Sequence, residues 1–208
     1  NAYDCTVNDV FLALASGALR RYLAEHGSIP RRTLTASVPV STRTKEDTVA
    51  WGNRLTTWYV ELATNVADPV ERLHRIHDNM RASRAALEDI RDLQHEWVEF
   101  WPLFKAFVFG LPRLVAPFVG HRPSYNVIVS NVAGPPRPLY RHGARLAHLI
   151  SMGPLVEGLG LNFTGWSYVD EMTVAVMGCR EHVPDIWELA AGLRASLDEL
   201  LVTCPVLQ

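Results

Sequence analysis

The sequence contains few cysteines, little net charge and no long uncharged apolar run. Its three cysteines, Cys5, Cys179 and Cys204, are widely spaced and form no CxxC pair. This pattern excludes a closed disulfide framework or a cysteine-based zinc site, and it suits a reducing compartment. The formal net charge of -2 argues against broad electrostatic binding of nucleic acid.

Several catalytic and targeting patterns are not found in these residues. No two of the eight histidines are adjacent. Gly165-Trp166-Ser167 begins like a nucleophile elbow, but Val169 stands where the GxSxG pattern needs glycine, which argues against a serine hydrolase. The first residues do not form a basic-then-apolar leader, so we expect a cytoplasmic protein.

Length, composition and periodicity predict one α/β domain over residues 1–208. Apolar residues make up 48% of the chain and charged residues 20%, as is ordinary for a globular domain. Apolar residues recur at helical or strand spacing in successive segments. The predicted helices cover 6–26, 68–90, 96–121 and 184 onwards, and the predicted strands cover 34–40, 55–63, 124–131, 144–152, 163–168 and 172–179. This order favours a two-layer sandwich with a mixed, largely antiparallel sheet and helices on one face.

The first helix begins with a capping motif. Thr6-x-x-Asp9 has the form of a capping box, and Asp9 in the first turn would also offset the helix dipole. Capping alone therefore explains Asn8 and Asp9, although a role near an active site stays open.

The stretch 124–140 combines a buried strand with a rigid turn. Tyr125, Val127 and Val129 point to one side, and Asn126, Ile128 and Ser130 to the other, which is the two-residue period of a strand. Proline stops the strand soon after Asn131, so Ser130 and Asn131 lie at its tip, before Gly134-Pro135. These polar groups either face a ligand or, for Asn131, hydrogen-bond their own loop.

Other candidates have simpler explanations. His74 and His77 form an HxxH pair without a third metal ligand nearby in sequence, so we interpret them as ordinary histidines. The arginines of the second helix alternate with acidic residues and predict a solvated, paired face rather than a coenzyme-phosphate site. These arginines are Arg72, Arg75, Arg81, Arg84 and Arg91. The buried side of the last helix is predicted to comprise Trp187, Leu189, Ala190, Leu193, Leu197 and Leu201.

The most aromatic stretch, 96–121, leaves three interpretations open. Lys105 and Arg113 interrupt it, so no uncharged run within it is long enough to cross a bilayer. It forms part of the core, it packs on another domain or lines an apolar groove, or it lies on a membrane surface.

Five segments together resemble the bacterial wax ester synthase/diacylglycerol acyltransferase family. Ser130-Asn131-Val132-Ala133-Gly134-Pro135, followed by Pro138-Leu139-Tyr140, resembles its SNxxGP and PLY block. The others are similar to its ND, VPVSxR, GNR and ADPxERL segments. They are Thr6-Val7-Asn8-Asp9-Val10, Val38-Pro39-Val40-Ser41-Thr42-Arg43, Gly52-Asn53-Arg54 and Ala67-Asp68-Pro69-Val70-Glu71-Arg72-Leu73.

The resemblance implies a chloramphenicol-acetyltransferase-like fold, in which two halves face each other across a substrate tunnel. The family's catalytic HHxxxDG motif belongs to the N-terminal half and does not occur here. The chain is therefore expected to be a C-terminal half that contains no catalytic residue and is inactive alone. Position-matching to the family assigns the tunnel lining to Asn131, Ser130, Gly134, Pro135, Asn8 and Asp9.

The implied reaction transfers a long-chain acyl group from acyl-CoA to diacylglycerol or a fatty alcohol. Acyl-CoA is a substrate, so neither a cofactor nor a metal is expected. The expected partners are the N-terminal domain of the same protein, the two substrates and a peripheral contact with the inner membrane or lipid droplets, but no nucleic acid. The alternative is a noncatalytic lipid- or protein-binding module with the same fold.

Overall fold

A computed structural model describes residues 3–41, 55–96, 125–155 and 158–204. The predicted helices within 97–121 and the GNR segment therefore lie outside the described residues. None of the helices in these ranges is both long and apolar enough to cross a bilayer.

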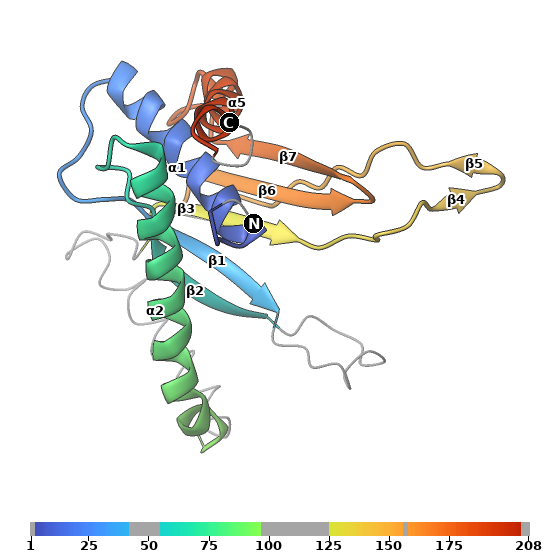
Figure 1. The fold of residues 1–208 in the computed structure, drawn as a ribbon, viewed down its shortest axis with the longest axis horizontal. Helices are drawn as coiled ribbons and strands as arrows, with labels where there is room; N and C mark the ends of the chain where they lie inside the picture. The colour runs from blue at the N-terminus through green and yellow to red at the C-terminus, as the bar shows by residue number, and fades with distance from the viewer. Residues whose placement is uncertain (1–2, 42–54, 97–124, 156–157, 205–208) are drawn as a thin grey trace.

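Five strands form one mixed sheet in the order β2-β1-β3-β6-β7 (Figure 1). The strands are β1 (Thr35–Ser41), β2 (Leu55–Glu61), β3 (Val127–Val132), β6 (Leu161–Tyr168) and β7 (Glu171–Gly178). The central strand β3 is parallel to both of its neighbours, whereas the edge pairs β1–β2 and β6–β7 are antiparallel. The antiparallel pairs are the longer ones, so the predicted mixed, largely antiparallel sheet is confirmed.

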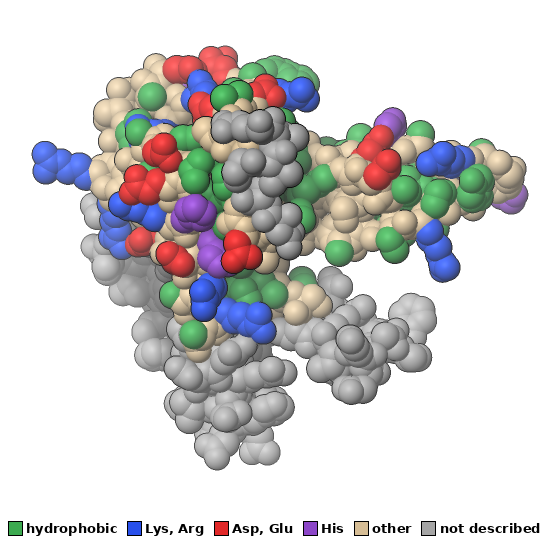
Figure 2. Space-filling view, viewed as in Figure 1, with side chains coloured by type: hydrophobic (Ala, Val, Ile, Leu, Met, Phe, Trp, Pro, Cys, Tyr) green, Lys and Arg blue, Asp and Glu red, His purple; other side chains and the backbone are tan. Residues whose placement is uncertain are grey.

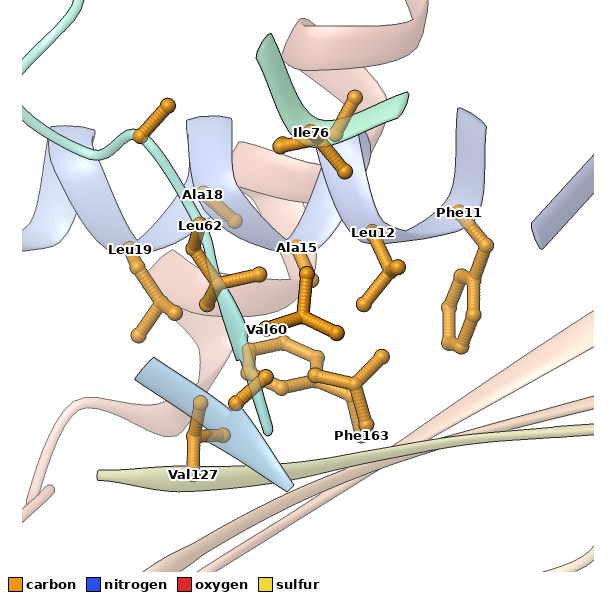
Figure 3. Packing of buried hydrophobic residues seen from close by; sticks show 14 of the residues in the cluster. Phe11, Leu12, Ala15, Ala18, Leu19, Val60, Leu62, Ile76, Val127 and Phe163 are labelled. Carbon is orange, nitrogen blue, oxygen red and sulfur yellow. The ribbon is translucent and has the colours of Figure 1, made fainter. Parts of the chain in front are cut away.

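Three helices cover one face of this sheet, as predicted. They are α1 (Val7–Glu25), α2 (Pro69–Glu96) and α5 (Ile186–Val202). Helix α1 lies over β3, between α2, which contacts β2, and α5, which contacts β7. Phe11, Leu12 and Phe163 are at most 1% exposed and meet between α1 and the sheet (Figure 3). Burial of these apolar side chains is the main force that holds the two layers together.

The buried side of α5 differs from the prediction. Trp187 is 82% exposed and Leu201 45% exposed, so neither belongs to the core. The residues that α5 buries are Leu189, Gly192, Ser196 and Leu200. Small residues lie on this side because α1 approaches closely: a Cβ atom at Gly192 would lie 3.0 Å from the Cα of Ala18. Apolarity alone cannot reveal such a contact.

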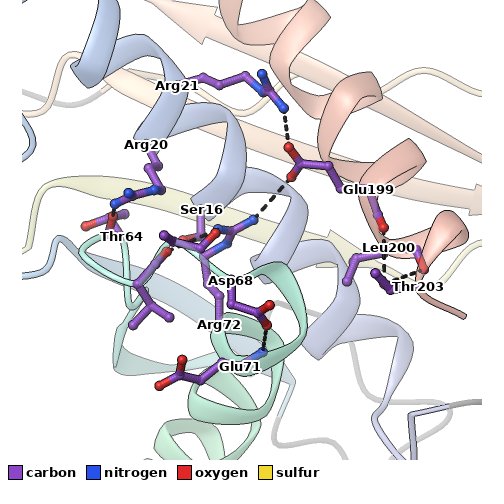
Figure 4. Close-up of polar contacts among 12 residues, drawn as sticks. Ser16, Arg20, Arg21, Thr64, Asp68, Glu71, Arg72, Glu199, Leu200 and Thr203 are labelled. Atoms are coloured by element: carbon purple, nitrogen blue, oxygen red, sulfur yellow. Dashed lines mark hydrogen bonds and ion pairs between the residues drawn. The ribbon is translucent and has the colours of Figure 1, made fainter.

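Helix α2 also departs from the prediction at one arginine. Arg75 pairs with Glu71 at 2.6 Å on an exposed face, as expected. Arg72, in contrast, is only 3% exposed, so the prediction of a solvated face was wrong for this residue. Its guanidinium binds two carbonyl oxygens and lies beside Glu199 of α5 (Figure 4). The guanidinium thereby links α2 to α5.

A hairpin arm projects from the sheet (Figure 1). The predicted strand over 144–152 was wrong: β5 comprises only Ala144–Arg145 and pairs with β4 (Tyr140–Arg141). His142 and Gly143, at φ 50° and 82°, form the tight turn between them, and positive φ at both positions is typical of such hairpins. The rest of the predicted strand has no ladder partner among the described residues.

The two strands of the arm are fixed to the sheet, just before β4 and just after β5, by a buried tyrosine at the end of β6. The Tyr168 hydroxyl accepts a hydrogen bond from Leu139 N at 2.9 Å and donates one to Leu146 O at 3.0 Å. Leu146 N also donates to Leu139 O at 2.9 Å. One side chain therefore ties both strands of the arm to the domain.

Candidate functional site

Asn131 lies at the end of β3, on the face covered by helices. Side chains alternate along a strand, so Asn131 shares the face of buried Val127 and Val129. Its register partner on β6 is Gly165. A Cβ atom at Gly165 would lie 3.2 Å from the ring of Phe11, in the second turn of α1. Asn131 therefore lies near the first turns of α1, which carry Asn8 and Asp9.

Ser130 lies on the opposite face of the same strand. Its register partner is Thr164, whose Oγ1 donates to Asn162 Oδ1 at 2.8 Å and accepts from Gly153 N at 3.0 Å. Asn162 Nδ2 in turn donates to Pro154 O at 3.0 Å. The returning segment of the arm thus packs beside this face of the sheet. The structure does not bring Ser130 and Asn131 together on one surface, because adjacent strand residues point apart.

The Gly134-Pro135 turn packs tightly against the end of β6. Gly134 N donates to Ser167 Oγ at 3.0 Å, and Pro135 O accepts from Val169 N at 3.0 Å. A Cβ atom at Gly134 would lie 1.9 Å from Ser167 O and 2.4 Å from Trp166 Nε1. No side chain fits there, so the close approach of two backbones requires glycine.

We expect Gly134→Ala to lower the free energy of unfolding by about 1–3 kcal/mol, because the added methyl group forces the turn away from β6. Thermal or urea unfolding of the complete protein measures this effect. Gly160→Ala is the matched control, since its Cβ atom would meet nothing closer than the Cβ of Cys179 at 3.5 Å. Equal stability of the two variants would contradict the packing argument.

The predicted capping box at the start of α1 is confirmed. Asp9 N donates to Thr6 Oγ1 at 3.2 Å, and Thr6 N donates to Asp9 Oδ2 at 2.9 Å. The carboxylate of Asp9 is buried, and its Oδ2 also lies 2.8 Å from His77 Nδ1 on α2. Asp9 therefore caps α1 and links it to α2. Sequence reasoning missed this link, because residues 68 positions apart carry no common local pattern.

We expect Asp9→Ala to lower the free energy of unfolding by about 1–3 kcal/mol, since a cap is lost and buried donors lose their acceptor. The exposed Asp78 offers a matched control, because Asp78→Ala removes the same charge from α2. Denaturation of both variants measures the difference. If Asp9→Ala leaves stability unchanged but abolishes the activity of the complete protein, the capping explanation is overturned and a role in the site is favoured.

Three side chains at this helix start have the spacing of a metal site. The ligand atoms of Cys5, Asp9 and His77 lie within 4.8 Å of one another. However, Asp9 Oδ2 already accepts from the backbone and hydroxyl of Thr6. Burial, followed by the charge of Asp9, raises the pKa of the Cys5 thiol and so disfavours the thiolate that a metal binds. The geometry of these three residues fits a structural hydrogen-bond cluster better than a metal site.

The six predicted site residues thus serve different purposes. Asn131 offers an amide donor and acceptor at a half-buried position, whereas the carboxylate of Asp9 is occupied by capping. Asn8 contacts α2, with its Nδ2 4.0 Å from Met80 Sδ. Gly134 and Pro135 shape the turn. This arrangement can position a polar ligand group, but none of the six has the free carboxylate or imidazole of a general base.

The comparisons with known proteins agree with the sequence motifs. Residues 51–201 match the family model described as the WS/DGAT C-terminal domain. Two putative diacylglycerol O-acyltransferases of Mycobacterium tuberculosis H37Rv are 37% and 38% identical to this chain over 96% of its length. The chain spans only 39% and 44% of their lengths.

The solved structures show the same fold. The wax ester synthase/diacylglycerol acyltransferase of Marinobacter aquaeolei VT8 superposes with a TM-score of 0.74 at 31% identity. This match covers 98% of the present chain and 45% of the other. The epimerization domain of tyrocidine synthetase B superposes with a TM-score of 0.59 at 15% identity, which shows the fold alone.

Proposed function

Because the chain belongs to the wax ester synthase/diacylglycerol acyltransferase family, as its C-terminal domain, we propose that it forms part of an acyl-CoA-dependent O-acyltransferase. The proposed reaction moves a long-chain acyl group from acyl-CoA to diacylglycerol or a fatty alcohol. In this proposal the chain forms one wall of the substrate tunnel. The observation that supports it most is the position of Asn131, half-buried at the end of β3 beside the first turns of α1.

The chemistry requires a second part of the protein. A base must take the proton of the acceptor hydroxyl, so that the oxygen can attack the thioester carbonyl while CoA leaves as a thiol. Donors must also stabilise the oxyanion of the tetrahedral intermediate. The HHxxxDG motif that supplies the base in this family does not occur in these 208 residues. We therefore assign the base to an N-terminal portion and substrate positioning to Asn131.

The arm supports the idea of an N-terminal partner domain. Leu139, Tyr140, Ile150 and Met152 on the arm are between 41% and 67% exposed. Figure 2 shows hydrophobic side chains gathered along this projection, interspersed with charged ones. A narrow hairpin cannot bury these side chains against itself, and exposed apolar groups of this kind mark contact surfaces. We assign this surface to contact with the N-terminal portion of the same protein.

The neutral-lipid products of the proposed reaction suggest where the protein acts. An acyl-CoA donor in the cytoplasm and a lipid acceptor in a membrane or droplet meet at a lipid surface. The proposal therefore places the complete protein in the cytoplasm, with peripheral contact at the inner membrane or at lipid droplets.

An assay of the complete protein tests the proposal. Radiolabelled palmitoyl-CoA is supplied with diacylglycerol, a fatty alcohol or a short polar alcohol, and the esters are separated by thin-layer chromatography. We expect ester formation with at least one lipid acceptor and release of free CoA in equal amounts. If the complete protein forms no ester with any acceptor but binds the lipids, the noncatalytic binding module becomes the better interpretation.

A further inference from the structure

A second site lies at the opposite end of α1 from Asn8 and Asp9. A cavity of about 550 Å³ opens where the last turns of α1 meet the start of β6 and the segment before α5. Its lining is mostly apolar and includes Leu19, Leu23, Leu34, Leu161, Val183 and Leu189. Its size falls within the range of small-molecule sites, which is about 300–1,000 Å³. It contacts the start of β3, whereas Asn131 lies at the end of that strand.

Cys179 and His182 line this apolar cavity together. The Sγ atom of Cys179 lies 3.2 Å from His182 Nδ1 and donates to Glu181 Oε2 at 2.8 Å. The backbone holds the cysteine in place, because Cys179 N donates to Gly160 O and Val183 N donates to Cys179 O, both at 2.8 Å. A nucleophile in contact with a potential base is the arrangement that covalent catalysis uses.

Of the two polar partners of this thiol, His182 is the one that suits proton removal. The hydrogen bond from Cys179 is the main cause that lowers the pKa of Glu181, so an ionised carboxylate accepts from the thiol and by itself opposes loss of the thiol proton. The Nδ1 atom of His182, 3.2 Å from the sulfur, can accept the thiol proton, and the resulting imidazolium would offset the charge of Glu181 beside the thiolate. The thiolate is the reactive form of cysteine, and a neighbouring base makes it accessible.

We propose that Cys179 is an S-acylation site that takes a long-chain acyl group from acyl-CoA and places the chain in the adjacent cavity. The sulfur attacks the thioester carbonyl carbon as the thiol proton passes to His182. The bond between that carbon and the CoA sulfur then breaks, and His182 returns the proton to the departing CoA thiol. One thioester forms and one is lost, so no oxidant or other reactant is required.

This inference rests on the proposed function for its donor, acyl-CoA, but not on ester synthesis. The other two cysteines lack the same surroundings. Neither Cys5 nor Cys204 lines the cavity, burial raises the pKa of the Cys5 thiol, and Cys204 is only 8% exposed. Acylation should therefore be selective for Cys179 among the three.

The test labels the purified complete protein with alkyne-tagged palmitoyl-CoA and locates the label by peptide mass spectrometry. We expect a hydroxylamine-sensitive label on Cys179, no such label on that peptide in Cys179→Ser, and unchanged labelling in Cys5→Ser. His182→Gln should slow labelling by about 10²-fold, the usual contribution of a positioned base. Leu23→Trp, which fills the cavity, should slow palmitoyl transfer more than transfer from acetyl-CoA.

Three results would overturn the proposal: equal labelling of all cysteines, a rate that His182→Gln leaves unchanged, or no preference for palmitoyl-CoA over acetyl-CoA. Ester synthesis is measured in parallel, and it should persist in Cys179→Ser. Label on Cys179 without any ester product would contradict the proposed function alone. Ester product without label on Cys179 would contradict the S-acylation site alone.

Discussion

Replacing Arg72 with alanine is expected to lower the free energy of unfolding by about 2–4 kcal/mol, because a large buried side chain is removed and carbonyl oxygens lose their donor. Arg72 Nη1 donates to Val66 O and Ala67 O, each at 3.2 Å. Its Nη2 lies 3.6 Å from Glu199 Oε2, and Glu199 also binds Arg21 of α1. The carboxylate of Glu199 therefore connects α5 to both α1 and α2, and removal of the Arg72 side chain leaves both a cavity and unpaired carbonyl groups.

Burying the charged guanidinium of Arg72 also costs free energy, because the charge loses its contact with water. Burial lowers the pKa of Arg72, and Glu199 acts in the opposite direction. We therefore expect Arg72→Lys, which keeps the charge but loses the fork of donors, to lie between the wild type and Arg72→Ala. Arg75→Ala is the matched control on the same helix, because its exposed pair with Glu71 is worth at most about 0.5 kcal/mol. Similar denaturation midpoints for Arg72→Ala and Arg75→Ala would contradict this account.

Replacing Asn131 with alanine is expected to slow acyl transfer by the complete protein about tenfold or more, while the melting temperature changes little. The proposed role of the amide is to hold a polar substrate group, and loss of one such hydrogen bond costs about 1–3 kcal/mol. Asn131 is half-buried at a strand end and belongs to no helix cap, so its removal should leave the core intact. Turnover with palmitoyl-CoA and a lipid alcohol measures the effect.

Asn126→Ala controls for the loss of an amide from the same segment. Asn126 is exposed just before β3, and its Oδ1 accepts from Thr35 N at 2.8 Å, far along the strand from Asn131. We expect Asn126→Ala to leave turnover near the wild-type rate. Unchanged turnover in Asn131→Ala would remove this residue from the site. A loss of turnover accompanied by a clear fall in melting temperature would indicate a structural role.

The elements of the fold were predictable where one local pattern decided them. Thr6 and Asp9 formed the predicted capping box, and the alternation of Val127 and Val129 located the central strand. The prediction failed where distant segments decided the outcome. Arg72 is buried because Glu199, which lies 127 positions later, returns beside it on α5. Trp187 lies off the buried side of α5, which is formed by Leu189, Gly192, Ser196 and Leu200.

The candidate site was less predictable than the fold. The motif around Asn131 identified the correct strand end, but the split of Ser130 and Asn131 between two faces follows from the register with β6. The pairing of Asp9 with His77 needs the packing of α1 on α2. The cluster of Cys179 and His182 has a local signal, since the two residues are three apart, but only the fold shows that they line an apolar cavity.

The most direct test of the account compares residues 1–208 alone with the complete protein in the same ester-synthesis assay, after circular dichroism has shown that the isolated chain is folded. We predict that the isolated chain forms no ester above background, because loss of a general base alone costs about 10²–10⁴ in rate. Ester synthesis by the isolated chain at a rate near that of the complete protein would contradict the account.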